Sequence, residues 1–208
     1  MLKGLDVYNL DVEVKWDQVA EADNAFAFVR GAYGDTPDPS AGIHAAGARA
    51  AGLKVGIYHF FRARMDSDKQ LGALLRALDA VNAGPGDLPP AIDIEDNPYF
   101  DGAWQPADNP AYLAAVRHWI DVVTARVGRA PVIYTRASFW DALTGTKGLN
   151  TCPLWVASYR EIAPKLPADW SDFTFWQYSE SGSVPGIGRP VDMSYFNGDA
   201  TALKNFLL

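Results

Sequence analysis

The sequence is poor in cysteine and histidine, with one Cys and three His among 208 residues. A single cysteine, Cys152, forms no disulfide within the chain. Because no histidine is near it in sequence, it is typical of a small buried side chain rather than a nucleophile. His-x-His and Glu-x-x-His spacings, which are common among metal ligands, are also absent. We therefore expect neither a metal ion nor another cofactor.

The chain also lacks an excess of positive charge and any long apolar run. Its 18 Lys and Arg residues are outnumbered by 25 Asp and Glu, for a net charge of −7. Nucleic acid is therefore not an expected partner, because its binding depends on Lys and Arg. No segment approaches the roughly 20 apolar residues of a membrane span. The stretch 1–7 is too short and too polar for a signal peptide.

Linkers, low-complexity tracts and fixed-period repeats are missing, and the composition is 49 % hydrophobic and 21 % charged. These features are typical of one globular domain, here residues 1–208. Short apolar runs alternate with helix-like stretches, which indicates parallel strands joined by helical crossovers. The expected strands are 2–7, 25–33, 53–60, 90–95, 131–134, 154–158, 173–178 and 191–195. The expected helices are about 39–51, 67–82, 110–127 and 138–143.

About eight strands is the number that closes a barrel. The helices become short or vanish in the C-terminal half, so we expect an α/β fold in the form of a single irregular, TIM-like β/α barrel. A parallel barrel carries its reactive groups at the carboxyl ends of its strands. Unexpected polar side chains fall at these ends: Asp6, Tyr33, Tyr58, His59, Asp93, Glu95, Tyr134, Ser158, Gln177, Tyr178 and, in the last strand, Asp192.

The sharpest local pattern is Ala91-Ile92-Asp93-Ile94-Glu95. Side chains two apart on a strand share a face, so Asp93 and Glu95 point one way while Ile92 and Ile94 pack against the outer helices. From this motif alone, two interpretations are equally good. Asp93 and Glu95 form a catalytic pair, or Asp93 caps the end of the strand and Glu95 is a solvated residue at the rim of the barrel.

Asp6 and Asp192 favour the catalytic interpretation. In a closed barrel the first and eighth strands are neighbours, so their carboxylates converge beside Asp93 and Glu95. Repulsion among four acids raises the pKa of some of them, and an acid that keeps its proton near neutral pH can protonate a glycosidic oxygen. A second carboxylate then acts as nucleophile, base or stabiliser. A metal-dependent hydrolase that uses the acidic cluster stays open as an alternative.

Several motifs follow one another in a fixed order over about residues 3–206. They are Gly4-Leu5-Asp6-Val7, Gly56-Ile57-Tyr58-His59-Phe60, Asp93-Ile94-Glu95, Trp155-Val156-Ala157, Phe175-Trp176-Gln177-Tyr178-Ser179, Gly186-Ile187 and Val191-Asp192-Met193-Ser194. This ordered set closely resembles glycoside hydrolase family 25, the Chalaropsis-type lysozymes. The resemblance implies an N-acetylmuramidase on a flattened β/α barrel. Such an enzyme cleaves the β-1,4 bond between N-acetylmuramic acid and N-acetylglucosamine in bacterial peptidoglycan, with retention.

The resemblance also implies roles for individual residues. Glu95 would be the general acid/base. Asp93 would be the nucleophile, or would stabilise an oxazolinium formed by the substrate's own 2-acetamido group. Asp6 and Asp192 would tune this pair and hold substrate. The expected saccharide groove and further binding positions comprise Tyr58, Tyr134, Trp155, Trp176, Gln177, Tyr33 and Arg30.

One segment departs from the family pattern. A Lys-Ala-Thr-Glu-Gly-like run often follows the second strand, whereas here it reads Arg30-Gly31-Ala32-Tyr33-Gly34, with no acid at the glutamate position. The implied substrate places the action at the cell wall, in the periplasm or outside the cell. Without a visible signal peptide, we expect release by lysis or delivery by a phage or a secretion apparatus. A wall-binding module without turnover is the remaining alternative.

Overall fold

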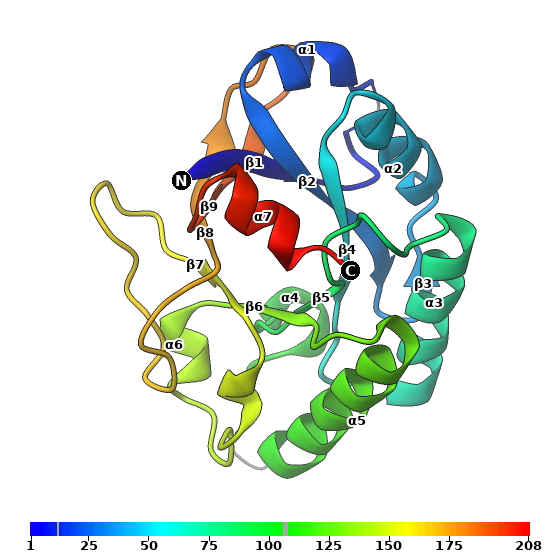
Figure 1. Cartoon of the computed structure of the whole chain (residues 1–208). Helices are drawn as coiled ribbons and strands as arrows, with labels where there is room; N and C mark the ends of the chain where they lie inside the picture. Colours follow the sequence, from blue (N-terminus) through cyan, green and yellow to red (C-terminus); the bar gives the residue numbers. More distant parts are fainter. Residues whose placement is uncertain (12, 106–107) are drawn as a thin grey trace.

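The computed structural model describes residues 1–11, 13–105 and 108–208. Eight strands form a closed barrel in the order β1, β9, β8, β7, β6, β5, β4, β2 and back to β1 (Figure 1). They are β1 (Leu2–Val7), β2 (Asn24–Tyr33), β4 (Lys54–Phe60), β5 (Ala91–Asp93), β6 (Val132–Thr135), β7 (Leu154–Ala157), β8 (Phe175–Gly182) and β9 (Val191–Phe196). A short β3 (Thr36–Pro37) pairs with β2. The expected barrel is therefore confirmed.

The direction of the last strand differs from the prediction. Around the barrel, the pairings β1–β2, β2–β4, β4–β5, β5–β6, β6–β7 and β7–β8 are parallel, as the alternation of strands and helices indicated. However, β9 runs antiparallel to both β8 and β1. Residues 183–190 are too few for a helical crossover, so the chain returns as a hairpin. Also, β8 continues to Gly182, so Gln177 and Tyr178 lie within that strand rather than at its end.

The helices cover the outside and the two ends of the barrel. They are α1 (Trp16–Glu21), α2 (Ala41–Ala50), α3 (Ser67–Ala80), α4 (Pro98–Asp101), α5 (Asn109–Val127), α6 (Ala137–Trp140), the 3-10 turn η2 (Leu149–Thr151) and α7 (Ala200–Phe206). The four expected helices correspond to α2, α3, α5 and α6, whereas α1, α4 and α7 were not expected. Segments 158–174 and 183–190 contain no helix, in agreement with the irregular C-terminal half. Across the described residues, no helix is long and apolar enough to cross a membrane.

Aromatic rings fill the barrel interior. Phe26, Phe28, Trp155 and Phe175 belong to one buried cluster, in which Phe28 and Trp155 stack with 4.3 Å between ring centroids. Gly56 leaves the space for this stack, because a Cβ there would lie 2.3 Å from the Phe28 ring. The interior is therefore a packed core, and a pocket can form only at an end.

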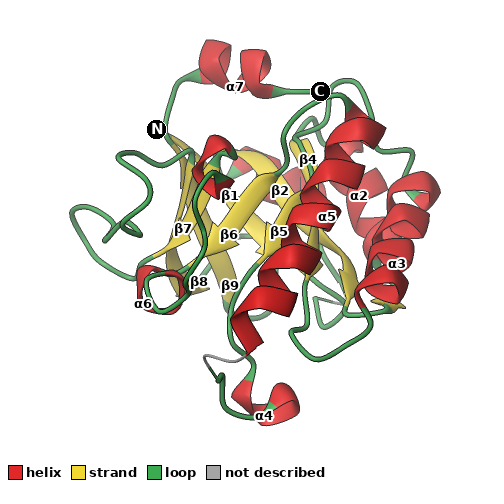
Figure 2. Ribbon diagram, turned by 90° about the horizontal axis from the view of Figure 1, so that it is seen from below, coloured by secondary structure: helices red, strands yellow, loops and turns green. Residues whose placement is uncertain are grey.

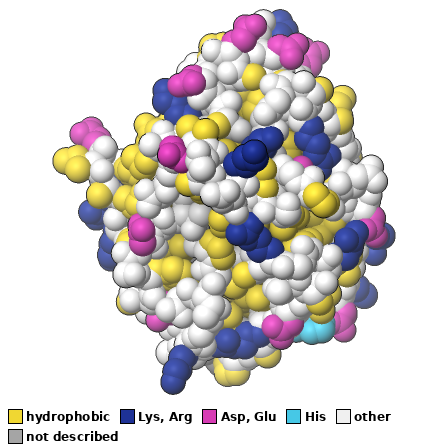
Figure 3. Space-filling view, in the orientation of Figure 1, with side chains coloured by type: hydrophobic (Ala, Val, Ile, Leu, Met, Phe, Trp, Pro, Cys, Tyr) yellow, Lys and Arg dark blue, Asp and Glu magenta, His cyan; other side chains and the backbone are white. Residues whose placement is uncertain are grey.

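One end of the barrel is covered by α7, while α4 lies at the opposite end (Figure 2). Leu203 of α7 packs into the inner cluster with Phe196, and the Arg129 guanidinium donates to the carbonyls of Asn205 and Leu207. On the face that carries α7, acidic and basic side chains are interspersed without a patch of one sign (Figure 3). The carboxyl ends of the parallel strands stay uncovered by α7.

Candidate active site

A pocket of about 270 Å³ at the carboxyl ends of the strands contains all four predicted carboxylates: Asp6, Asp93, Glu95 and Asp192. Six other predicted residues line it as well, namely Arg30, Tyr33, Tyr58, Tyr134, Trp155 and Gln177. Two lining residues, Tyr8 and Phe60, were missed because nothing in their local sequence separates them from ordinary core or loop aromatics. The structure thus joins residues from all eight barrel strands in one pocket.

Asp6 and Asp192 face each other directly across the β1–β9 pair. The reversal of β9 explains this contact, because Asp192 begins its strand where Asp6 nears the end of β1. Burial and the Asp192 carboxylate raise the pKa of Asp6 well above its usual value, and burial raises that of Asp192 to about 6. The two carboxyls therefore form a coupled pair that holds a proton more tightly than isolated aspartates do.

Asp93 and Glu95 share a face, as their spacing predicted, and their isoleucine neighbours Ile92 and Ile94 pack in the outer core. Burial raises the pKa of Glu95 to about 7, against the lowering effect of Arg136. Burial and the Glu95 carboxylate also raise the pKa of Asp93. Within the described residues, Oδ1 of Asp93 is buried and has no hydrogen-bond partner. The pair therefore combines an acid whose pKa is about 7 with a second, buried carboxyl group.

A β-bulge brings Arg30 and Tyr33 to the same pocket. These residues are three apart and would point to opposite faces of a regular strand. The pairing of β2 with β4 shifts register between Arg30 and Ala32, which reverses the alternation. Arg30 donates to Asp38 at 2.8 Å and lies over the Tyr8 ring, so its charge is already paired at the rim of the pocket.

Gln177 lies at the centre of the polar network under the pocket. Its Oε1 accepts from the Tyr134 hydroxyl at 2.8 Å and from the Tyr159 hydroxyl at 3.1 Å, and its Nε2 donates to Asp6 at 3.0 Å. Tyr159 was not among the predicted residues because it lies in the segment after β7, where only the tertiary fold brings it to Gln177.

The two candidate tryptophans have different locations. Trp155 forms the floor of the pocket, is 2 % exposed and donates from Nε1 to the Ser194 hydroxyl at 3.0 Å. Trp176 lies on the outer face of β8, packed with Leu154 and Val156, and lines a separate hollow with Tyr178. Trp176 therefore lies outside the central pocket, although the hollow that it lines shares Tyr159, Arg160 and Glu180 with the hollow beside Glu95 and Tyr134. Its neighbour Gln177 points inward, so Trp176 must point outward.

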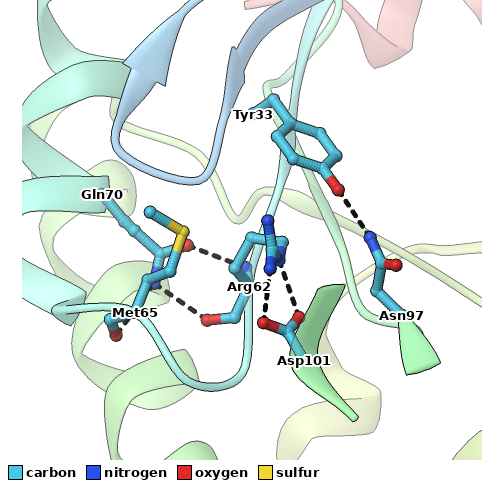
Figure 4. A network of polar contacts seen from close by, with 6 residues as sticks. All are labelled: Tyr33, Arg62, Met65, Gln70, Asn97 and Asp101. Atoms are coloured by element: carbon cyan, nitrogen blue, oxygen red, sulfur yellow. Dashed lines mark hydrogen bonds and ion pairs between the residues drawn. The ribbon is translucent and has the colours of Figure 1, made fainter. Parts of the chain in front are cut away.

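A second network of hydrogen bonds and an ion pair holds the segment after β5 beside the pocket (Figure 4). Arg62 forms a bidentate ion pair with Asp101 of α4, with N–O distances of 2.6 and 2.7 Å, and both side chains are largely buried. Asn97 donates to the Tyr33 hydroxyl at 2.6 Å. The Gln70 side chain accepts from the backbone N–H of Arg62 and donates to the Arg62 carbonyl, which holds the turn that carries Arg62. Residues 97–101, which follow Glu95, are thereby fixed to the β4 end.

His59 is fully buried outside the pocket. Its Nδ1 accepts from Trp119 Nε1 at 3.0 Å and its Nε2 lies 2.9 Å from the Gly34 carbonyl, so it orients neighbours by hydrogen bonding. Burial lowers the pKa of His59 to about 4. Among residues 1–11, 13–105 and 108–208, no group of three or more His, Cys, Asp or Glu side chains is arranged to hold a metal ion.

Two further hollows adjoin the pocket. One, of about 340 Å³, shares Glu95 and Tyr134 with it. Another, of about 310 Å³, shares Asp6, Tyr8 and Asp192. Together they extend the pocket into a longer groove, which suits a polymeric substrate.

An acid with a pKa of about 7 beside a second buried carboxylate is what hydrolysis of a glycosidic bond requires. Fold and site together define a glycoside hydrolase of the β/α-barrel class. The sequence profile described as "Glycosyl hydrolases family 25" matches residues 5–187, and the chain belongs to this family.

Individual relatives agree with this assignment. The chain is 33 % identical to Lysozyme M1 of Streptomyces globisporus over 97 % of its own length and 70 % of that protein. It superimposes on the bacterial lysozyme from Streptomyces coelicolor with a TM-score of 0.86 and 29 % identity, covering 99 % of this chain and 96 % of the other. For the family GH25 lysozyme from Aspergillus fumigatus, the TM-score is 0.83 at 27 % identity, with 99 % and 98 % covered.

Proposed function

We propose that this enzyme is an N-acetylmuramidase. It hydrolyses the β-1,4 bond between N-acetylmuramic acid and N-acetylglucosamine in peptidoglycan, with retention. Membership in a family of lysozymes and muramidases supports peptidoglycan hydrolysis. The observation that carries the residue assignment is the pair Asp93 and Glu95 in one pocket, with the pKa of Glu95 raised to about 7.

In the proposed mechanism, Glu95 gives its proton to the glycosidic oxygen as the bond to the anomeric carbon breaks. Asp93, which lines the same pocket, accepts from the N–H of the 2-acetamido group. The acetamido oxygen then attacks the anomeric carbon and forms an oxazolinium, which the Asp93 carboxylate stabilises. Glu95, now ionised, takes a proton from a water molecule. This water attacks the anomeric carbon from the face that the leaving group occupied and opens the oxazolinium ring. The alternative is direct attack by Asp93.

Asp6, Asp192 and Gln177 act on this pair through position and charge. The carboxyls of Asp6 and Asp192 raise the pKa of Asp93, whereas Arg30 lowers it. We propose that the same acids hold sugar hydroxyls, and that Tyr58 and Tyr134 contact the sugar above the Trp155 floor. Peptidoglycan lies outside the cytoplasmic membrane, so the proposed site of action is the cell wall. Lysis, a phage particle or a secretion apparatus would bring the enzyme there.

The test is reducing-end release from purified peptidoglycan, with mass spectrometry of the new end. We expect N-acetylmuramic acid at that end and a product of retained β configuration by NMR. Glu95→Gln is expected to lower turnover by at least ~10²-fold, the usual scale for general acid catalysis. Glu21→Gln makes the same chemical change on exposed α1 and should leave turnover unchanged.

Three outcomes would contradict the proposal. Normal turnover by Glu95→Gln would remove the assigned acid. Wall binding by the wild type without any new reducing ends would favour a binding module. Loss of activity in EDTA that a divalent ion restores would favour the metal-dependent alternative.

A further inference from the structure

The hollow beyond Glu95 differs from the central pocket in charge. It has a volume of about 340 Å³, and its lining includes three cations: Arg136, Arg160 and Lys165. The central pocket instead holds four carboxyls and one arginine. The groove is therefore acidic where the bond would break and basic on the side that Glu95 and Tyr134 border.

Two of these cations are not neutralised. Arg136 is paired with Asp96. Within the described part of the chain, neither Arg160 nor Lys165 forms an ion pair, whereas Arg30, Arg49 and Arg62 each pair with an aspartate. The acids that line the same hollow are Glu95, whose pKa of about 7 leaves it substantially protonated at neutral pH, and the exposed Glu180.

The backbone that carries Arg160 and Lys165 is held by hydrogen bonds and is linked to the network under the pocket. Lys165 N donates to the Ser158 hydroxyl at 3.0 Å, and Arg160 N donates to the Ser158 carbonyl at 2.9 Å. Tyr159, between them in sequence, donates to Gln177. The segment therefore presents Arg160 and Lys165 next to the proposed acid rather than on a remote surface.

We propose that Arg160 and Lys165 form a carboxylate-binding subsite for the muramoyl part of the substrate. This inference rests on the proposed function and names the substrate group that the hollow recognises. N-acetylated sugar rings are neutral, and the carboxylates of peptidoglycan belong to the stem peptide or, where that peptide has been removed, to the lactyl group. A guanidinium binds a carboxylate through two parallel hydrogen bonds, and an ammonium adds a second charge. The subsite thus distinguishes muramoyl strands from uncharged glycans.

The test compares Arg160→Gln/Lys165→Gln with the matched double variant Arg76→Gln/Lys147→Gln. The latter removes the same charge from exposed residues away from the groove. On native peptidoglycan strands we expect KM to rise about 5- to 20-fold for the first variant with kcat little changed, as for charge-assisted hydrogen bonds in a partly solvated site. The second variant should match the wild type. The wild-type KM should also rise with salt.

Modified substrates identify the carboxylate. When all carboxylates are converted to amides, the wild-type KM should rise to that of Arg160→Gln/Lys165→Gln, and the variant should not change further. Strands trimmed by an amidase have lost the stem peptide and carry a free lactyl carboxylate, which is part of an amide bond in intact strands. A variant defect that is present on intact strands and lost on trimmed strands assigns the stem peptide, and a defect on trimmed strands assigns the lactyl group.

The proposal is overturned if the wild type releases reducing ends but Arg160→Gln/Lys165→Gln has an unchanged KM on both intact and trimmed strands, or if both double variants are equally impaired. Failure of the proposed function gives a different result, because the wild type would then release no reducing ends from any of these strands.

Discussion

Tyr134 and Tyr159 donate their hydroxyl hydrogens to the same oxygen, Oε1 of Gln177, although they come from β6 and from the segment after β7. Two donors on the oxygen determine which way the amide points, so Nε2 faces Asp6. The network thereby links the segment that carries Arg160 to the carboxylate beside Asp192.

Gln177→Leu tests this network. The substitution leaves Asp6 and the Tyr134 hydroxyl buried without their partner, so we expect the free energy of unfolding to fall by about 1–3 kcal/mol. Urea denaturation measures this loss. Tyr159→Phe is the control, because its side chain is 53 % exposed and water can replace the partner. An equal loss in both variants would show that Gln177 does not act as the shared acceptor.

The pH dependence of kcat/KM follows from Glu95. General acid catalysis needs the protonated form, so activity should decline as pH rises through about 7. Arg136 lowers the pKa of Glu95 and Asp96 raises it. Arg136→Gln should therefore move the alkaline limb to higher pH, and Asp96→Asn to lower pH, each by about half a unit or more. Shifts in the same direction for both variants would contradict this electrostatic assignment.

Glu95 should also reduce stability at neutral pH. Its pKa in the folded protein, about 7, lies above the ordinary 4.5, so the folded state binds the proton more tightly. Its contribution to stability is full below pH 4.5 and is lost as pH rises through 7. At pH 8 we expect Glu95→Gln to melt about 3–6 °C above the wild type, and at pH 4 the two should melt together. Glu21→Gln should show no such pH-dependent difference.

Arg62→Gln tests the attachment of α4. Loss of the two-pronged pair with Asp101 leaves a largely buried carboxylate without its partner, so residues 97–101 should detach from the β4 end. Limited proteolysis should cut the variant faster within this segment, and KM should rise because the segment directly follows Glu95. Arg126→Gln removes an exposed pair with Asp79 and should leave both unchanged. Unaltered proteolysis of Arg62→Gln would show that other contacts are enough to hold residues 97–101 in place.

The sequence predicted those parts of the fold and site that depend on periodicity. Asp93 and Glu95 line one pocket, as their two-residue spacing predicted, although β5 ends at Asp93. The same rule, applied to Gln177, would have placed Trp176 outside the pocket. The predicted strands 173–178 and 191–195 left twelve residues between them, which does not exclude a crossover. The extension of β8 to Gly182 shortens the connection to eight residues and explains the hairpin. By contrast, the bulge after Arg30 and the contact of Tyr159 with Gln177 depend on tertiary pairing. Short α4 and α7 have too few turns to show a helical pattern.

The hairpin return of β9 has a practical consequence. After β9 the chain leaves at the end of the barrel remote from the four acids, where α7 and the first residues of β1 also lie (Figures 1 and 2). Both termini thus emerge behind the catalytic face. A tag, tether or additional module joined at either terminus would extend away from the groove, so immobilised or fused forms of this enzyme should keep an unobstructed approach for a glycan strand.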